Sequence, residues 1–341
     1  MLRIETGDWR LEIRDWLYDM KLPNYLITSL YYEQIVRGTT IMTAKVILNP
    51  FSGRGAALKR LDDVRAALTA VGVAYELVLT ERPHHATELA QTAVTQGYSP
   101  IIAAGGDGLL NEVINGVAAA AGVGDWPTFG VLPLGTANDL VANLGLPTDL
   151  AKAAQVIARG EVRPMDVGVV NDHIFLNNAG LGLESYISVI QNRLTWAKGI
   201  VRYLTATFMG IAQNPQWRMH LQWDGGEYNG DVTLVSIGNA PRTGGIFYTV
   251  PHADPFDGKL TFVYGHIATR LQILRTLPRT MKPDVGSYVE HPAVHEVHAT
   301  WLKVRAETPT PMHADGEIVS QAVQELSYEI LPAKLPILIS M

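Results

Sequence analysis

The sequence predicts an α/β protein in two parts: an N-terminal α/β domain with a mainly parallel sheet, then a C-terminal antiparallel β-sandwich domain. Short apolar runs alternate with segments of helical periodicity up to about residue 158, which is typical of a parallel sheet covered by helices. Strict alternation of apolar and polar residues becomes common after about residue 163. The 341 residues are enough for two hydrophobic cores.

The first half begins with a short apolar strand over residues 45–48, which ends at Asn49 and Pro50. Apolar residues then recur at helical spacing from Leu58 to Val71, and Gly72 is a natural end for this helix. The next predicted elements are strands over residues 73–79, 101–104 and 128–132, and helices over residues 85–96, 109–121, 138–143 and 149–158.

The second half is predicted to consist mainly of antiparallel strands. A hairpin over residues 166–170 and 173–177 is expected to turn at Asn171 and Asp172. Apolar residues alternate over residues 217–223, before a glycine-containing turn. Further strands are expected at residues 232–235, 260–264, 297–304 and 318–330, and helices at roughly 194–211 and 268–281.

Composition excludes several classes of protein. The net charge of −6 argues against a general nucleic-acid-binding protein. The chain has no cysteine, which excludes disulfides, thiolate metal sites and a cysteine nucleophile, and which fits a reducing cytoplasm. No run of 18 or more apolar residues is present, so we expect any membrane contact to be peripheral.

Residues 1–41 differ from the rest, with several Trp and Tyr residues among scattered charges and no strand pattern. We expect the fold to start near Met42, and the preceding segment is an extension of unknown role, either an amphipathic addition or an overlong gene start. The expected domains are residues 42–165, with residues 320–341 returning to them, and residues 166–319.

Four motifs contain the residues suited to chemistry. The first, NPFSGRG at residues 49–55, follows the first strand. Its small residues leave backbone N–H groups free to face an anion at the positive end of the next helix. It lacks the Lys-Ser or Lys-Thr pair of a P-loop, and an ordinary turn is the alternative.

The second motif is GGDG at residues 105–108, between a strand and a helix. Its glycines allow close approach of a ligand, and Asp107 lies where ligands gather in open α/β sheets. Asn111 and Glu112 follow in the helix. The alternative is a turn in which Asp107 caps the helix.

The third motif, PLGTANDL at residues 133–140, also follows a strand. Thr136 could cap a helix or contact a phosphate oxygen. Asn138 and Asp139 add polar groups that a plain turn does not need. The fourth motif, HADGE at residues 313–317, is either a solvated hairpin turn or the site of a general base.

Together, in this order and spacing, NPxSG, GGDG, PxGTANDL and DGE resemble the catalytic domain of the diacylglycerol kinase family, which includes bacterial soluble lipid kinases and sphingosine and ceramide kinases. The resemblance covers about residues 44–335. NAD kinases share a GGDG motif but lack the PxGTANDL segment, so they match less well.

The resemblance implies ATP as phosphoryl donor, Mg²⁺, and a cleft between the two domains. Glu317 would accept the proton of the lipid hydroxyl, with Asp315 beside it, and Asp107 would help to hold Mg²⁺. The residues implied for the nucleotide site and cleft are Asn49, Pro50, Ser52, Gly53, Thr80, Gly105, Gly106, Asp107, Gly108, Asn111, Glu112, Gly135, Thr136, Asn138, Asp139 and Asp166.

A further segment, residues 251–260, resembles a family signature for a structural Mg²⁺ site. Asp257, with backbone oxygens near Asp254 and Lys259, would supply the oxygen ligands that this cation prefers. Without the resemblance to the family, we would interpret the segment as an ordinary Asp-Gly turn.

Two positions depart from the family pattern, since Leu109 replaces a frequent Thr and Ile318 replaces a frequent Pro. Leu109 would remove a hydroxyl near the phosphates.

We therefore expect a cytoplasmic, peripherally membrane-associated enzyme that phosphorylates diacylglycerol or a similar lipid. A homodimer is compatible with the sequence. Alternatives are a kinase for a sphingoid base or phosphatidylglycerol, an NAD kinase, and an inactive nucleotide- or lipid-binding regulator.

Two predicted helices combine basic and apolar residues. Each could bind an anionic bilayer, or each could be an ordinary surface helix with a solvated basic face and an apolar face on the core. The first set is Arg193, Leu194, Trp196, Lys198, Ile200, Val201 and Arg202, and the second is Arg270, Leu271, Ile273, Leu274, Arg275, Leu277, Arg279 and Lys282.

Overall fold

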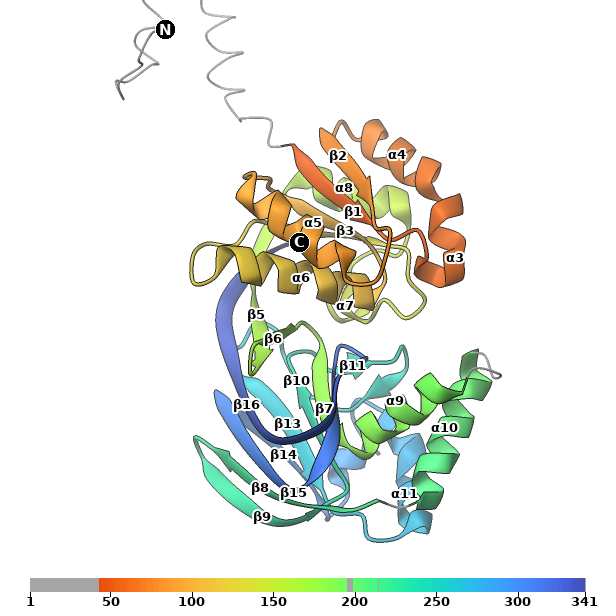
Figure 1. Ribbon diagram of the computed structural model, residues 1–341, viewed down its shortest axis with the longest axis vertical. Helices are drawn as coiled ribbons and strands as arrows, with labels where there is room; N and C mark the ends of the chain where they lie inside the picture. Colours follow the sequence, from red (N-terminus) through yellow and green to blue (C-terminus); the bar gives the residue numbers. More distant parts are fainter. Residues whose placement is uncertain (1–42, 195–198, 214, 341) are drawn as a thin grey trace, which may run out of the picture. The chain divides into compact units, whose positions relative to one another are not determined.

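The computed structural model of the chain describes residues 43–194, 199–213 and 215–340 (Figure 1). The extension predicted at residues 1–41 lies outside the described residues. Helices and strands are labelled below as in Figure 1.

The first half of the described chain contains a parallel sheet in the strand order β2-β1-β3-β4. Every residue of β1, β3 and β4 is buried, as expected when helices cover both faces of a sheet. The predicted alternation of strand and helix is therefore confirmed. The strands are β1 (Ala44–Leu48), β2 (Tyr75–Leu79), β3 (Ile101–Gly105) and β4 (Phe129–Pro133).

Helices lie on both faces of this sheet. Helices α5 and α6 share one apolar core with the sheet, and α3, α4 and α8 share another on the opposite face. The helices are α3 (Ser52–Lys59), α4 (Leu61–Ala70), α5 (His85–Thr95), α6 (Asp107–Ala121), α7 (Asp139–Asn143) and α8 (Leu150–Arg159).

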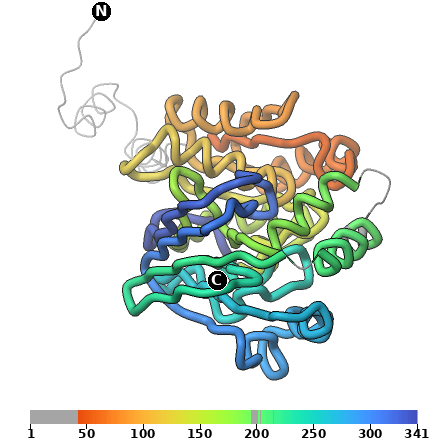
Figure 2. The backbone as a smooth tube through the Cα atoms, turned by 60° about the horizontal axis from the view of Figure 1, so that its bottom comes forward, coloured from red at the N-terminus to blue at the C-terminus, as the bar shows by residue number. Residues whose placement is uncertain are grey.

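The second half is a β-sandwich with helices at one side. Figures 1 and 2 both show α9 and α10 lying side by side, and the two helices are in contact. Its strands are β5 (Val162–Val170), β6 (His173–Phe175), β7 (Asn178–Gly182), β8 (Trp217–Trp223), β9 (Gly226–Val232), β10 (Leu234–Gly238), β11 (Arg242–Thr243), β12 (Phe247–Tyr248), β13 (Leu260–Gly265), β14 (Val294–Ala299), β15 (Trp301–Ala314) and β16 (Glu317–Leu338). Its helices are α9 (Leu183–Arg193), α10 (Gly199–Gln213), α11 (Arg270–Thr276), and the 3₁₀ turns η1 (Leu277–Met281) and η2 (Tyr288–Glu290).

Strand β15 joins the two branches of the sandwich. Its first part pairs with β8, and its last residues pair with β7, which continues through β10 and β13 to β14. Register shifts between Arg305 and His313 separate the two pairings. Side chains from both branches, such as Met219 and Phe262, form one core.

Strand β16 connects the sandwich with the parallel sheet, and it is visible as the long dark-blue strand in Figure 1. It begins at Glu317 beside β15, and Ile337 near its end pairs in parallel with Phe129 of β4. Ala333, with φ of +51°, lies in the irregular stretch between these pairings. The segment predicted as a strand over residues 318–330 is thus part of a longer strand that also reaches β4.

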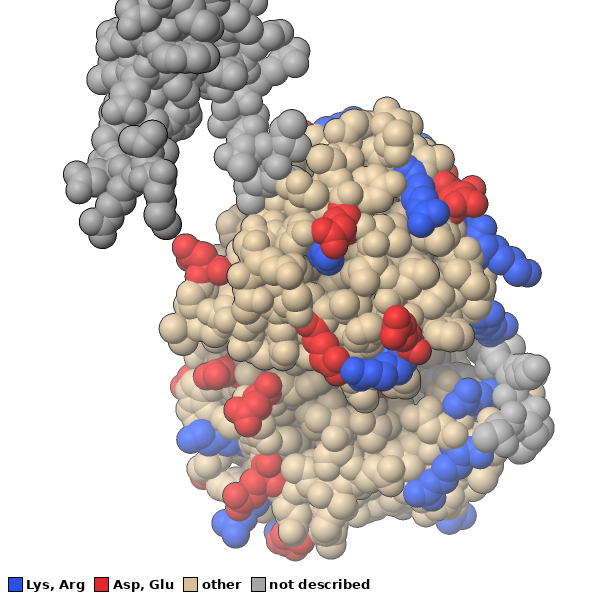
Figure 3. Space-filling view, turned by 45° about the horizontal axis from the view of Figure 1, so that its top comes forward, with Lys and Arg blue, Asp and Glu red and all other residues tan. Residues whose placement is uncertain are grey.

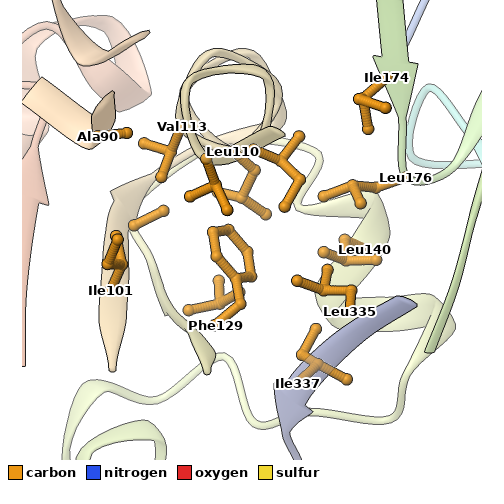
Figure 4. Packing of buried hydrophobic residues seen from close by; sticks show 14 of the residues in the cluster. Ala90, Ile101, Leu110, Val113, Phe129, Leu140, Ile174, Leu176, Leu335 and Ile337 are labelled. Atoms are coloured by element: carbon orange, nitrogen blue, oxygen red, sulfur yellow. The ribbon is translucent and has the colours of Figure 1, made fainter. Parts of the chain in front are cut away.

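The core at this junction is shown in Figure 4. Phe129 of β4 lies below Leu110 and Val113 of α6, and Leu335 and Ile337 of β16 lie beside it. The C-terminal strand therefore supplies side chains to the core of the first half. Among the described residues, no helix is long and apolar enough to cross a membrane.

The predicted helix over residues 194–211 is wrong at its start. Helix α9 ends at Arg193, Leu194 is its C-cap, and α10 begins at Gly199. Helix α9 was not predicted, although Leu183, Ile187 and Ile190 recur at helical spacing and are buried. Trp196 and Lys198, which were assigned to this helix, lie outside the described residues.

Two other predicted elements are interrupted. The strand predicted over residues 297–304 is two strands, because Thr300 between them donates its N–H and hydroxyl to Asp224 Oδ2 at 2.8 and 2.7 Å. The helix predicted over residues 268–281 changes to a 3₁₀ turn at Leu277, next to Pro278, whose ring nitrogen has no N–H to donate. Thr269 caps its start.

Phe129→Ala is expected to lower the free energy of unfolding by about 3–5 kcal/mol, because it leaves a cavity at the contact of β4, α6 and β16. Urea unfolding measures the change. Val123→Ala is the control, since Val123 is fully exposed; its effect should stay within about 0.5 kcal/mol. An equal, small effect of both substitutions would contradict the core described here.

Candidate active site

Three glycine-containing loops touch at the carboxyl ends of β1, β3 and β4. A Cβ atom on Gly53 would lie 2.7 Å from the Leu134 carbonyl oxygen, and one on Gly135 would lie 2.4 Å from the Gly106 Cα. Side chains have no room at such contacts, so glycine permits the loops to meet. This edge of an open α/β sheet is where ligands bind in such folds.

The loop after β1 has an unusual backbone. Gly53, Arg54 and Gly55 have successive φ angles of +59°, +62° and +83°. The Asn49 side chain fixes the start of the loop by accepting the Phe51 N–H at 2.9 Å. Backbone turns of this kind form concave sites for anions, which is compatible with the predicted phosphate contacts.

Three other predicted nucleotide contacts lie around this loop. The Pro50 carbonyl accepts an N–H from α3 at 3.2 Å. Ser52 Oγ would lie 3.0 Å from a Cβ on Gly105, so the first and second loops are adjacent. Thr80 is buried at the end of β2, where its N–H donates to the Leu48 carbonyl at 2.9 Å.

Two carboxylates lie close together at the second and third loops. Asp107 begins α6, and its Oδ1 accepts the Leu140 N–H at 3.3 Å. Asp139 begins α7 and is buried. Burial, and then the negative charge of Asp107, raise the pKa of Asp139 to about 6. Burial also raises the pKa of Asp107, while hydrogen bonds from backbone N–H groups oppose the change.

Asp139 also connects the two halves of the fold. Its Oδ1 accepts the Gly245 N–H at 2.9 Å and lies 3.7 Å from Arg242 Nε. Asn143, one turn later, accepts the Arg242 N–H at 3.1 Å. Arg242 places a cation beside the carboxylates and was not predicted as a site residue. The sequence signal that could have indicated it is the polar, glycine-rich RTGG segment after β10.

Asn138 shapes the third loop. It has φ of +49°, its Oδ1 accepts the Gly135 N–H at 3.0 Å, and its Nδ2 donates to the Gly135 carbonyl at 3.3 Å. Thr136 between them is exposed, and its hydroxyl makes no hydrogen bond within the described part of the chain. Thr136 is therefore free to contact a ligand, whereas Asn138 holds the loop.

The DGE motif is a tight hairpin turn between β15 and β16. Ala314 pairs with Glu317, and the two central residues, Asp315 and Gly316, have φ of +46° and +83°. Positive φ at both positions is typical of a type I′ turn, for which Asp-Gly is well suited. The hairpin interpretation is therefore correct, but the Asp315 carboxylate is not solvated.

The Asp315 carboxylate accepts four hydrogen bonds. Its Oδ1 accepts the N–H groups of Asn177 and Asn178 at 2.8 and 3.2 Å. Its Oδ2 accepts the Leu176 N–H and the Asn111 Nδ2, both at 2.9 Å. Burial raises the pKa of Asp315, and these hydrogen bonds oppose it by stabilising the charged form. With its oxygens fully used, Asp315 holds the turn in place.

Glu317 lies against the second glycine loop. Its Oε1 would be 3.1 Å from a Cβ on Gly108, the residue after Asp107. The side chain is exposed, and within the part of the chain that the structure describes its carboxylate makes no hydrogen bond or ion pair. The first residue of β16 therefore presents an uncommitted carboxylate to the GGDG loop.

Asn111 and Glu112 have structural partners. Asn111 is buried, and its Nδ2 also donates to the Ile174 carbonyl at 3.0 Å, so it links α6 with β6 and the DGE turn. Glu112 accepts the N–H groups of His84 and Ala86 at 3.2 and 3.3 Å, which caps α5. Contact of either residue with a nucleotide stays a prediction.

Asp166 is a buried link within the second half. Its two oxygens accept the N–H groups of Gly258 and Ala333, both at 2.6 Å. It thereby fixes the loop before β13 against the irregular part of β16. Its contact with a nucleotide or substrate also stays a prediction.

The predicted Mg²⁺ segment lies in that same loop before β13. Asp254 accepts the Phe256 N–H at 3.0 Å, and Asp257 accepts the Lys259 N–H at 2.9 Å. Both carboxylates are exposed. Oxygen ligands of this kind would suit a hard cation, and a Mg²⁺ site at this loop stays a prediction. No group of three or more acidic, histidine or cysteine side chains suited to a metal occurs among the described residues.

Of the two departures from the family pattern, Leu109 is buried in the core of the first half. Its Cδ2 would lie 2.4 Å from a Cβ on Gly105, so the side chain packs beneath the second loop. Ile318 pairs with His313 across the hairpin.

Comparisons with known proteins agree with this arrangement. Residues 43–170 match the family model for the diacylglycerol kinase catalytic domain. Residues 177–339 match the YegS C-terminal NAD kinase beta sandwich-like domain. The two matches follow each other along the chain, with the first covering the glycine loops and the second covering the DGE turn.

Curated relatives named diacylglycerol kinase cover most of the chain. The protein from Staphylococcus saprophyticus subsp. saprophyticus is 31% identical over 80% of this chain and 88% of its own length. The one from Staphylococcus haemolyticus is 30% identical over 80% of this chain and 82% of its own. The structure of a diacylglycerol kinase from Bacillus anthracis str. Sterne shares the fold, with a TM-score of 0.68 and 23% identity over 88% of this chain and 97% of its own.

The chain thus combines an α/β half that carries glycine loops with a β-sandwich half that carries a carboxylate facing them. It is a protein of the lipid kinase class. The chain belongs to the diacylglycerol kinase family. The family expected from the four motifs is confirmed.

The raised pKa of Asp139 predicts a pH-dependent stability. The folded pKa of about 6 exceeds the ordinary 3.8, so the folded state binds more protons between these values and its stability falls as the pH rises through them. Asp139→Asn should flatten this decline by on the order of 2 kcal/mol. Urea unfolding at several pH values from about 4 to about 6 measures it; parallel curves for wild type and variant would contradict the assignment.

Proposed function

We propose that the protein transfers the γ-phosphoryl group of ATP to the hydroxyl of diacylglycerol or a similar lipid. The observation that supports this most strongly is the Glu317 carboxylate beside Gly108, because a carboxylate without a partner in the described part of the chain then lies next to the glycine loops that would bind phosphate. The names of the curated relatives support the same acceptor class.

In this proposal the three loops bind the triphosphate through backbone N–H groups at helix N-termini. Thr136 adds an exposed hydroxyl, and Arg242 adds positive charge on the side of the β-sandwich. Mg²⁺, when bound, would neutralise charge on the phosphate oxygens, and Asp107 would help to hold it.

The lipid hydroxyl would attack the γ-phosphorus in line. A bond forms between the hydroxyl oxygen and the γ-phosphorus, the bond to the bridging oxygen of ADP breaks, and Glu317 accepts the hydroxyl proton. Asp315 and Asn111 act as positioning residues, since they hold the turn from which Glu317 extends.

Glu317→Gln should lower kcat by about 10²-fold or more, because the amide does not accept the proton. ATP binding should change little, since the glycine loops are intact. The assay uses labelled ATP, Mg²⁺ and a panel of lipids in micelles, with NAD as a control acceptor. Glu325→Gln, an exposed glutamate on the same strand, is the matched control. A fully active Glu317→Gln enzyme would remove this residue from the role of base.

We also propose that α10 and the segment from α11 to η1 dock on an anionic bilayer. Val201, Leu204 and Phe208 recur on one face of α10 and are exposed, with Phe208 at 57%. Leu271 and Leu274 are exposed on α11, which contacts α10. Apolar side chains gathered this way on a protein surface indicate a binding surface.

Charge around these residues favours an anionic partner. Arg270, Arg275 and Lys282 are exposed, whereas Asp284 is the nearby exposed acid and Glu290 is paired with Arg279. Figure 3 shows basic side chains along the lower right of one face, with no acidic side chain visible among them. A bilayer surface that is rich in anionic headgroups attracts such a surface, and salt weakens the attraction.

Phe208→Ser combined with Leu271→Ser should lower co-sedimentation with anionic vesicles by about tenfold, since two exposed apolar side chains are removed. Val123→Ser, at a fully exposed apolar residue elsewhere, is the control and should leave it unchanged. Binding of wild-type protein that is indifferent to anionic lipid content and to salt would contradict the docking proposal while leaving the kinase proposal untouched.

A further inference from the structure

The short hairpin of β11 and β12 lies against α7, where the β-sandwich meets the first half of the chain (Figure 1). Two glycines begin its turn, and Gly244 and Gly245 have φ of +61° and +85°. A Cβ atom on Gly245 would lie 3.8 Å from the Ala137 Cβ, so this turn reaches the third glycine loop. The hairpin therefore borders the candidate active site.

The backbone of Arg242, the first residue of this hairpin, is held by one side chain of α7. Asn143 Oδ1 accepts the Arg242 N–H at 3.1 Å, and Asn143 Nδ2 donates to the Arg242 carbonyl at 3.0 Å. A side-chain amide can make both bonds because it carries a donor and an acceptor. The point from which the Arg242 side chain extends is therefore fixed relative to α7.

The Arg242 guanidinium is poorly paired. Its Nε is buried and has no hydrogen-bond partner among the described residues. The nearest carboxylate oxygen, Asp139 Oδ1, lies 3.7 Å from Nε and already accepts the Gly245 N–H at 2.9 Å. A buried donor on a charged group is costly to leave without a hydrogen bond, so an ion pair that served only to join the two halves would gain from closer contact. The geometry indicates another partner for this cation.

Exposure and charge also favour a ligand as that partner. The Arg242 side chain is 28% exposed, whereas the Asp139 side chain is 8% exposed. Burial, and then the charge of Asp107, raise the pKa of Asp139 to about 6, against the Gly245 hydrogen bond and the charge of Arg242. The arginine thus offsets only part of what raises this pKa. A more highly charged anion that enters the site would compete well for Arg242.

The residues that hold Arg242 also hold the turn that carries Glu317. Asn143 Nδ2 donates to Asn177 Oδ1 at 3.0 Å, in addition to its bond with Arg242. The Asn177 N–H donates to Asp315 Oδ1 at 2.8 Å. The arginine and the proposed base are therefore connected through two asparagines and one buried carboxylate.

The residue after Arg242 makes a second connection to the same turn. Thr243 Oγ1 donates to Asn178 Oδ1 at 2.9 Å. The Asn178 N–H donates to the Asp315 carboxylate at 3.2 Å. Both residues of β11 are thus tied to the segment that fixes the DGE turn, which keeps Arg242 and Glu317 on one hydrogen-bonded framework.

The charges of the site require a cation at this position. Asp107, Asp139 and Glu317 are carboxylates beside loops that would bind a triphosphate. During phosphoryl transfer, negative charge is spread over the oxygens of the transferred group, and a fixed cation that faces them lowers the barrier. The planar guanidinium group matches these oxygens with paired N–H donors.

We propose that Arg242 is a further catalytic residue, whose guanidinium turns from Asp139 to the γ-phosphoryl group and donates hydrogen bonds to its oxygens during transfer. This inference rests on the proposed lipid kinase function. The bond changes stay the same: the hydroxyl oxygen bonds to the γ-phosphorus, the bond to the bridging oxygen of ADP breaks, and Glu317 takes the hydroxyl proton. Arg242 releases no proton and balances charge only. Asn143 is a positioning residue that acts through Arg242.

Arg242→Ala should lower kcat by about 10³-fold at saturating ATP and Mg²⁺, because the transferred group loses its fixed cation. The acceptor is 1,2-diacylglycerol in mixed micelles. The affinity for ADP, measured by calorimetry, should stay within about threefold of wild type, since ADP has no γ-phosphoryl group. Arg305→Ala removes an exposed arginine that pairs with Glu325 and is the matched control, with both quantities unchanged.

Two further variants separate catalysis from folding. Arg242→Lys keeps a positive charge beside Asp139, and its kcat should lie at least about tenfold below wild type because lysine lacks the planar fork. Asn143→Leu should lower kcat by about tenfold with ADP affinity unchanged, because Arg242 loses its fixed position. Thermal unfolding reports whether each variant is folded.

Full kcat in the folded Arg242→Lys variant would show that a positive charge beside Asp139 is sufficient, and would overturn the proposal. Wild-type kcat in folded Arg242→Ala would do the same. Equal losses of kcat and ADP affinity would assign Arg242 to holding the two halves together, and would also overturn it. Each of these results leaves the kinase assignment standing. Absence of phosphorylation of every lipid by the wild-type enzyme would instead remove the proposed function, and the role of Arg242 with it.

Discussion

The interaction on which this site depends most is the set of four hydrogen bonds to the Asp315 carboxylate. The three backbone N–H donors are Leu176 and Asn177, in the link between β6 and β7, and Asn178, the first residue of β7. The fourth donor is the side chain of Asn111 on α6, so both halves of the chain hold this turn. The turn has positive φ at both central residues, so its direction is fixed. Glu317 follows this turn directly, and its position beside Gly108 is a consequence of it.

Strand β16 extends this connection through the fold. It begins at the turn, pairs with β15 and β5, and reaches β4 at Ile337. The loops that end β1, β3 and β4 and the turn that carries Glu317 are thus parts of one hydrogen-bonded sheet. Such a framework limits relative motion of the proposed base and the proposed phosphate-binding loops. Phosphoryl transfer needs such positioning more than covalent participation of the protein.

Much of the fold was predictable because its signals are local. Parallel buried strands that end in glycine motifs bring those motifs to one edge of the sheet, and this does not depend on contacts with distant residues. The hairpin at Asn171 follows from the preference of Asn and Asp for tight turns. The roles of individual polar residues were less predictable. Glu112 caps α5, and Asp139 binds Gly245 of the other half; these partners are distant in sequence and leave no local pattern. The split of the predicted strand at Thr300 depends in the same way on Asp224.

In the proposed mechanism the glycine loops and Glu317 form one site for the phosphoryl donor and the lipid hydroxyl. A crystal structure of the chain with a non-hydrolysable ATP analogue and Mg²⁺ tests it most directly. We expect the triphosphate to lie along the loops that end β1, β3 and β4, with the γ-phosphate facing Glu317 across a gap that one hydroxyl group fills. A nucleotide bound elsewhere, or a γ-phosphate that points away from Glu317, would contradict it.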